Sequence, residues 1–138
     1  MKKSKKLVAL FAAVLMVVAV FSSAIPANAA KHTGTITCGT YKANIQLIAM
    51  NISGTAKTTS NKTAENLQAF VVATKVDKNG KQITPDMDSS YCVNGTDSGT
   101  AGVGIKVGSS DRYKNITSTH GAKFKGYSEQ ARNLSESF

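Results

Sequence analysis

The feature that most constrains the fold is a two-residue alternation of apolar and polar side chains. Residues 66–76 are the strongest strand candidate, with Leu67, Ala69, Val71 and Ala73 on one face and Phe70, Val72, Thr74 and Val76 on the other. Side chains of a β-strand point alternately to opposite faces, so this segment predicts a strand. Weaker forms of the pattern recur in residues 32–38, 41–52, 100–107 and 113–124. No stretch has a convincing helical period, and the pattern therefore predicts an all-β protein.

Composition and turn spacing extend this prediction to an architecture. Serine and threonine make up 25 of the 109 residues from Ala30 onward, and Pro85 is the only proline there. Residues 77–80, Asp-Lys-Asn-Gly, predict a hairpin turn, because Asn and Gly accept positive φ at little cost. Strand candidates follow one another every 8 to 14 residues or so, which is typical of an antiparallel β-sandwich of about seven to eight strands. A closed barrel is the alternative.

The first 29 residues have the three parts of a secretory signal peptide. Four lysines form a basic head, residues 7–21 are apolar without interruption, and Ala27-Asn28-Ala29 has the small residues of a cleavage site. Retention as a membrane anchor is the alternative, but the apolar run is shorter than the roughly 18 to 20 residues of a spanning helix. The sequence therefore predicts a secreted bacterial protein with a signal peptide at 1–29, one domain at 30–138 and no stable membrane span after cleavage.

The charge of the predicted mature chain is positive. Removing the four leader lysines from 17 Lys and Arg leaves 13 against 8 Asp and Glu, a net charge of +5. Such a chain is attracted to anionic surfaces, although +5 is also an ordinary solubility charge. The candidate binding residues are the basic residues of the last third and a tyrosine among them: Arg112, Lys114, Lys123, Lys125, Arg132 and Tyr127.

We expect these residues to bind an anionic envelope polymer or lipid, and we expect no nucleic-acid partner. The tyrosine would stack on sugars or lipid headgroups while the cations hold the negative charge. The alternative is that the lysines protect exposed edge strands from aggregation.

Two cysteines, Cys38 and Cys92, lie in the predicted mature chain. In an oxidising compartment a single pair of cysteines predicts one disulfide bond. A loop of this length would stabilise the domain by roughly 4 kcal/mol in the chain-entropy model. Metal binding would require more soft ligands at close spacing, so we expect no metal and no cofactor.

Two short segments resemble parts of known sites. Asp86-x-Asp88-x-Ser90 resembles the opening of a calcium loop, but Tyr91 replaces the expected glycine and no acidic residue closes the loop. Residues 97–99, Asp-Ser-Gly, echo the nucleophile segment of trypsin-like proteases, whose fold needs about twice this length. We interpret the first segment as a solvated bulge and the second as a turn.

The two histidines stand alone in the sequence. His32 follows the cleavage site closely, and His120 lies in Ser118-Thr119-His120-Gly121 near a predicted strand end. We interpret His120 as a surface histidine held by a neighbouring hydroxyl group. A small hydrolase would require Asp86, Asp88 or His120 to meet in a pocket, so the sequence favours a protein that binds and has no catalytic residues.

Residues 117–120, Thr-Ser-Thr-His, before a Lys125-Gly126 turn, together with Cys38-Gly-Thr-Tyr41 soon after the leader, resemble small uncharacterised secreted β-sandwich proteins of Gram-positive bacteria. A more distant resemblance is to lactococcin-972-type bacteriocins, exported β-sandwiches that act on cell-wall precursor. The tryptophan and tyrosine motifs of that family are missing here, so no residue role carries over. The resemblances imply an exported β-domain, for which an envelope-associated binding module is the main hypothesis and a bacteriocin-like toxin acting on wall precursor or membrane is the alternative.

Overall fold

The computed structural model describes residues 28–138, and the predicted signal peptide therefore lies almost wholly outside the described residues. The described chain forms six β-strands and no helix: β1 (Ala30–Cys38), β2 (Tyr41–Met50), β3 (Ser53–Val76), β4 (Gln82–Gly104), β5 (Arg112–Lys123) and β6 (Gln130–Ser137). Across these residues there is accordingly no helix long and apolar enough to cross a membrane. The predicted all-β class is confirmed.

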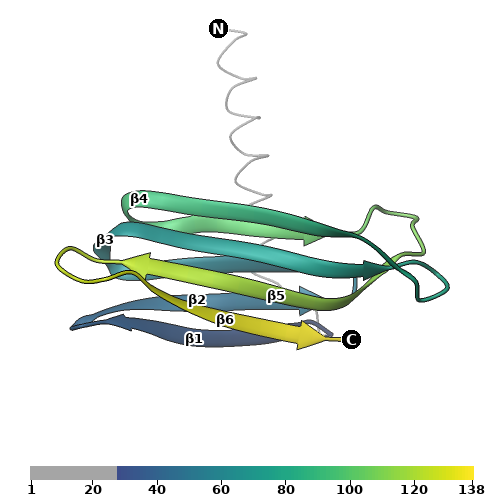
Figure 1. The fold of residues 1–138 in the computed structure, drawn as a ribbon, viewed down its shortest axis with the longest axis horizontal. Coiled ribbons are helices and arrows are strands. Elements are labelled where there is room, and N and C mark those ends of the chain that lie inside the picture. Colours follow the sequence, from purple (N-terminus) through teal and green to yellow (C-terminus); the bar gives the residue numbers. More distant parts are fainter. Residues whose placement is uncertain (1–27) are drawn as a thin grey trace, which may run out of the picture.

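The strands form one antiparallel sheet in the order β1-β2-β3-β5-β6, with β4 paired to β3. The sheet curls until its first and last strands, β1 and β6, lie side by side (Figure 1). The result is an antiparallel sheet nearly closed into a barrel, with the turns gathered at its two ends.

The expected count of seven to eight strands is wrong because β3 and β4 each join segments that look separate in the sequence. β3 runs through residues 61–65, whose polar composition is typical of a loop, and its register with β4 shifts between Thr59 and Ala64. β4 likewise runs through Pro85, where the register with β3 shifts between Ala73 and Lys75. Proline is tolerated there because β4 pairs with β3 alone and is an edge strand.

β3 contributes to two parts of the sheet. Its first half pairs with β2 and with the end of β4, whereas its second half pairs with β5 and with the start of β4. β4 must therefore turn a corner between its two halves. Asn94, with φ 52°, and Gly99, with φ 75°, adopt left-handed conformations at this corner.

Side-chain contacts close the barrel at the two places where neighbouring strand edges are not paired by backbone hydrogen bonds. Between β1 and β6, the His32 imidazole pairs with the Glu136 carboxylate, and Arg132 donates to the carbonyl oxygen of Thr35 at 3.2 Å. Between the two halves of β4, the Gly102 amide donates to the Asp88 carboxylate at 2.8 Å. These two lines of contact, here called the β1–β6 seam and the β4 seam, hold the sheet in its curled form.

The interior consists of two apolar clusters with a polar layer between them. Along β5, Ile116 belongs to one cluster and Ala122 to the other, while Ser118 and His120 lie between them. The larger buried apolar side chains come from alternate positions, as predicted: Ile45, Leu47, Leu67, Val71, Ile116 and Phe124. Most of the other core residues are alanines, so the interior is narrow.

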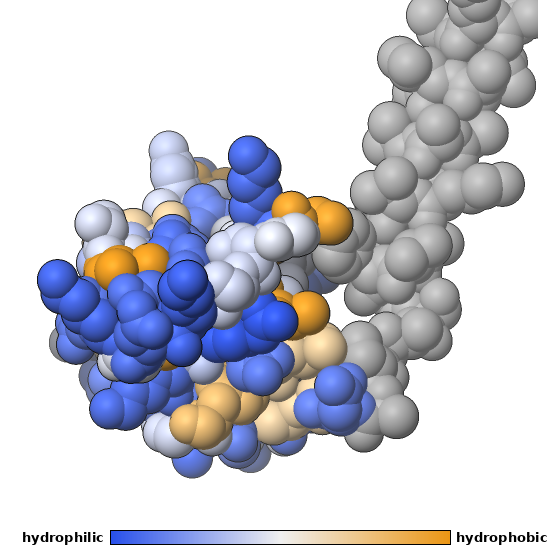
Figure 2. Space-filling view, turned by 90° about the vertical axis from the view of Figure 1, so that its right-hand side faces the viewer, coloured by the Kyte–Doolittle hydropathy of each residue, from blue (hydrophilic) through white to orange (hydrophobic). Residues whose placement is uncertain are grey.

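The two ends of the barrel differ in the chain segments that form them. One end carries the β2–β3 turn, the β3–β4 turn, the β4–β5 loop and the C-terminus, and its surface is mostly hydrophilic with small apolar areas (Figure 2). Val107, the last residue of the predicted strand 100–107, lies in the β4–β5 loop and is 98% exposed. The opposite end carries the β1–β2 turn, the corner of β4 and the β5–β6 turn.

Candidate binding surfaces

Hydrogen bonds centred on His120 cross the polar layer of the interior. His120 is fully buried, with Nδ1 2.9 Å from Thr58 Oγ1 and Nε2 2.8 Å from Ser118 Oγ. Thr58 donates its own hydroxyl proton to the Gln68 carbonyl oxygen at 2.6 Å. His120 Nδ1 therefore donates to Thr58, and Ser118 donates to Nε2. The histidine is held by hydroxyl groups as expected, but its expected place on the surface is wrong.

The burial of His120 agrees with its position in the alternating pattern of β5. His120 shares the even parity of Ile116, Ala122 and Phe124, which face the core. Burial lowers the pKa of His120 to about 4, so the imidazole is neutral at pH 7. Because His120 and Ser118 are both fully buried, no substrate meets this pair in the folded protein.

The three residues that resemble a calcium loop each have a partner of their own. Asp86 pairs with Lys75 at 2.8 Å and accepts a hydrogen bond from the Tyr113 hydroxyl at 2.6 Å. Burial alone would raise the pKa of Asp86, but these two partners outweigh it and lower the pKa below its usual value. The Asp88 carboxylate accepts a hydrogen bond from the Gly102 amide across the β4 seam, and the Ser90 hydroxyl donates to the Ser98 carbonyl oxygen. In residues 28–138 no cluster of three potential metal ligands forms.

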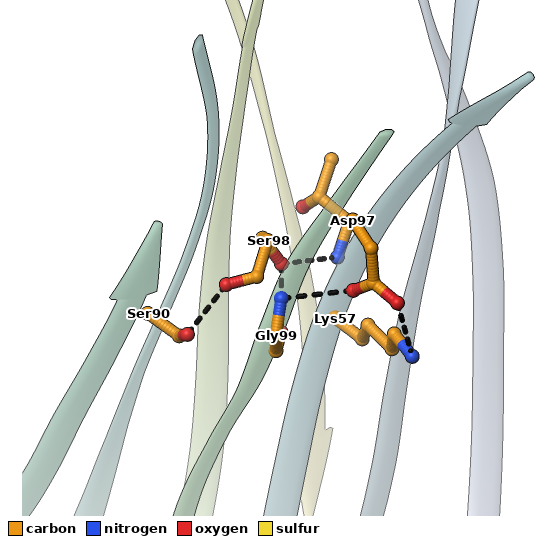
Figure 3. Close-up of polar contacts among 6 residues, drawn as sticks. Lys57, Ser90, Asp97, Ser98 and Gly99 are labelled. Carbon is orange, nitrogen blue, oxygen red and sulfur yellow. Dashed lines mark hydrogen bonds and ion pairs between the residues drawn. The ribbon is translucent and has the colours of Figure 1, made fainter. Parts of the chain in front are cut away.

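Residues 97–99, which echo a protease nucleophile segment, form the corner of β4. The Gly99 amide donates to Asp97 Oδ1 at 2.8 Å, and Lys57 pairs with the other carboxylate oxygen (Figure 3). Ser98 is 2% exposed, and its hydroxyl oxygen accepts a hydrogen bond from the Thr58 amide. The aspartate and serine are therefore engaged in turn geometry, as we expected for this segment.

The expected disulfide between Cys38 and Cys92 is absent, and both residues are free thiols. Cys38 is buried in the core, where its sulfur contacts the Ala122 carbonyl at 3.5 Å. Cys92 instead folds over the backbone of its own strand, so closely that a Cβ at Gly95 would overlap its sulfur. The two sulfurs thus have separate local partners. Burial raises the pKa of the Cys38 thiol.

The predicted cationic residues fall into three places. Lys123, Lys125 and Tyr127 lie at the β5–β6 turn. Arg112 and Lys114 lie at the other end of β5, roughly 35 Å away at the usual rise per residue. Arg132, the remaining member, belongs to the β1–β6 seam. That these residues bind an anionic polymer stays a prediction, but they do not share one face.

The structure brings the β1–β2 turn and the β5–β6 turn together through an aromatic group. The Tyr41 ring stacks on Phe124, with centroids 5.1 Å apart, and meets the Tyr127 ring edge-on at 5.8 Å. Phe124 is buried, whereas Tyr41 and Tyr127 are 36% and 39% exposed. The Tyr127 ring lies on Gly39, whose φ of 60° and missing side chain leave it room.

Exposed lysines lie at the same end of the barrel as these tyrosines. Lys125 precedes Tyr127 in its turn, and Lys42 follows Tyr41. Lys62 is adjacent to Lys42, because the hydroxyl of Ser60 accepts from the Lys62 amide and donates to the Lys42 carbonyl. Within the described residues none of the three lysines forms an ion pair. We call the set Tyr41, Lys42, Lys62, Lys125 and Tyr127 the basic pole.

Sequence reasoning found only half of the basic pole. Lys125 and Tyr127 were candidates because basic residues gather near them in the chain, but Tyr41 and Lys42 lie more than 80 positions earlier. The Cys-Gly-Thr-Tyr turn was the one available signal for that half. Comparisons with protein-family models, curated proteins and solved structures found no match to this chain.

Proposed function

We propose that the protein is a secreted, non-enzymatic binding module that holds a phosphate-rich anionic polymer or lipid of the cell envelope on its basic pole. One observation carries the proposal: three exposed lysines, without carboxylate partners among the described residues, lie at the same end of the barrel as two partly exposed tyrosines. Lysine ammonium groups attract phosphate as point charges, and tyrosines present both an aromatic face and a hydroxyl group.

The arrangement of the nearby carboxylates supports this proposal. Glu65 is paired with Lys123 at 3.3 Å, and Glu129 lies over Gly121 on the outer face of β5. Neither is paired with a lysine of the basic pole. Within residues 28–138 the three lysines of the basic pole are therefore not neutralised by an ion pair.

Cosedimentation tests the proposal. The purified protein is mixed with isolated Gram-positive cell walls, or with anionic liposomes, at low and at high salt. We expect pelleting at low salt that is lost at high salt, because exposed charges are screened within a Debye length of about 10 Å at 0.1 M. Pelleting with walls alone would identify a wall polymer as the partner, and pelleting with liposomes a lipid headgroup.

The decisive variant replaces Lys42, Lys62 and Lys125 with alanine. At about 1 kcal/mol for each lysine near an anionic surface, low-salt affinity should fall about a hundredfold. The matched control replaces Lys78, Lys81 and Lys106, exposed lysines of the opposite end, and removes the same charge. Equal losses in the two variants would show that only net charge matters, and no pelleting of the unchanged protein would reject the function.

A further inference from the structure

A second surface, on the outer face of the sheet, combines an exposed aromatic ring with amide side chains. An open groove of about 570 Å³ crosses β4, β3 and β5 and is lined by Glu65, Asn66, Gln68, Tyr91, Val93 and Lys123. Tyr91 and Val93, on the edge strand β4, are 72% and 62% exposed. Three strands at the usual spacing of about 4.8 Å make the groove roughly 10 Å wide.

The register of the sheet fixes which side chains face one another across the groove. Tyr91 lies opposite Gln68, and on the other side of Gln68 lies Gly121. Gly121 has no side chain of its own, and the Glu129 carboxylate lies over it, so the row consists of Tyr91, Gln68 and Glu129. In the next row Asn66 lies between Val93 and Lys123. The groove thus has an apolar wall on β4 and amides along its middle strand.

The amides in the middle of the groove have unused hydrogen-bonding capacity. In residues 28–138 the side chains of Asn66 and Gln68 make no hydrogen bond to the protein, although each offers two donors and an acceptor. A protein-docking surface has the opposite arrangement, with an apolar centre and a polar rim. At the edge of this groove, Lys123 and Glu65 form an exposed ion pair at 3.3 Å.

We propose that this groove binds the pyranose rings of a glycan. A sugar ring has an apolar face of C–H groups, which stacks on an aromatic ring such as Tyr91. Its edge carries hydroxyl groups that both donate and accept hydrogen bonds, as amides such as Asn66 and Gln68 also do. The width of the groove accommodates one or two rings. Tyr91 supplies the stacking surface, and the two amides supply orientation.

This glycan groove is separate from the basic pole. It binds through stacking and hydrogen bonds, whereas the basic pole binds through charge. None of the five residues of the basic pole lines it, and its one lysine is already paired with Glu65. Binding in the groove should therefore persist at high salt, where binding at the basic pole is lost. The two sites are independent, so that either one remains if the other is disproved.

The experiment uses insoluble chitin and insoluble cellulose as probes for the purified full chain at high salt. We expect retention on at least one of them, with chitin alone indicating N-acetylated rings and both indicating the pyranose ring itself. Tyr91→Ala should weaken retention about tenfold or more, the usual effect of truncating an aromatic anchor. Tyr91→Phe should retain most of the binding, because the ring face is kept.

Met87→Ala is the matched control. Met87 lies four residues before Tyr91 on β4, its side chain is on the same face of the sheet, and it is 61% exposed. This variant should bind like the unchanged protein. No retention on either polysaccharide would overturn the proposal, and so would equal losses in Met87→Ala and Tyr91→Ala, which would indicate adsorption through a general apolar surface. Urea unfolding of Tyr91→Ala should give a midpoint close to that of the unchanged protein, which shows that this variant is folded.

Discussion

Acidification below pH 7 should destabilise the protein through His120. Burial lowers the pKa of His120 from 6.5 to about 4 in the folded protein. Between these two values the unfolded chain binds a proton that the folded chain does not, so the free energy of unfolding falls as the pH falls. The full effect is about 3 kcal/mol, and about 2 kcal/mol of it lies between pH 7 and pH 5.

Urea unfolding at pH 7 and at pH 5 measures this difference. His120→Gln removes the titrating group and should reduce the difference to a few tenths of a kcal/mol, whatever its effect on stability at pH 7. His32→Gln removes the histidine of the β1–β6 seam and should leave most of the difference in place. If His120→Gln does not fold, an NMR titration of the unchanged protein replaces it, and the imidazole of His120 should remain neutral at pH 5. An equal change in the unchanged protein and in His120→Gln, or a protonated imidazole at pH 5, would refute the assignment.

Three further predictions concern stability and thiol chemistry. Gly39→Ala should lower the free energy of unfolding by about 1 to 3 kcal/mol, because φ is 60° at this position and a Cβ would overlap the Tyr127 ring. Urea unfolding measures this loss. Asp86→Ala should cost about 2 to 3 kcal/mol in the same assay, since the buried Tyr113 hydroxyl and a lysine lose their partner, whereas a solvated bulge would lose almost nothing. A thiol reagent applied to the native protein should modify Cys92 quickly and Cys38 only on unfolding, and a protein that reacts at neither position until it is reduced would contain the disulfide after all.

The faces of the strands were predictable from sequence, because parity alone decides which side chains point inward. Leu67 and Val71 share one face of β3, as their parity indicated, and the structure shows that this face is the buried one. The continuity of β3 and β4 was not predictable in this way. Polar residues 61–65 have the composition of a loop, yet β4 pairs with the segments on both sides of them, while β2 pairs with the other edge of the first segment and β5 with that of the second. A strand that bends through a register shift has no local signature in composition.

In the candidate sites, too, residues close together in the sequence could be grouped in advance, whereas residues brought together by strand pairing could not. Lys125 and Tyr127 are close in sequence and could be grouped from it, whereas their neighbours Tyr41 and Lys42 belong to a turn at the other end of the described chain. The glycan groove depends on the register that sets Tyr91 opposite Gln68, which only strand pairing decides. The disulfide prediction was wrong because the count of cysteines carries no information about which neighbours each sulfur meets.

The β1–β6 seam has a consequence for the order in which the protein folds. β1 pairs with β2 through a local turn, but among residues 28–138 the side-chain contacts of its other edge are with β6, about 100 residues further along the chain. Contacts at such a separation are slow to form, since a long loop must first be closed. Until β6 arrives, the outer edge of β1 remains a free template for pairing with other chains. The contacts of the β1–β6 seam should therefore form late in folding. When they form, they cover the last open edge of β1 and protect it from pairing with other chains.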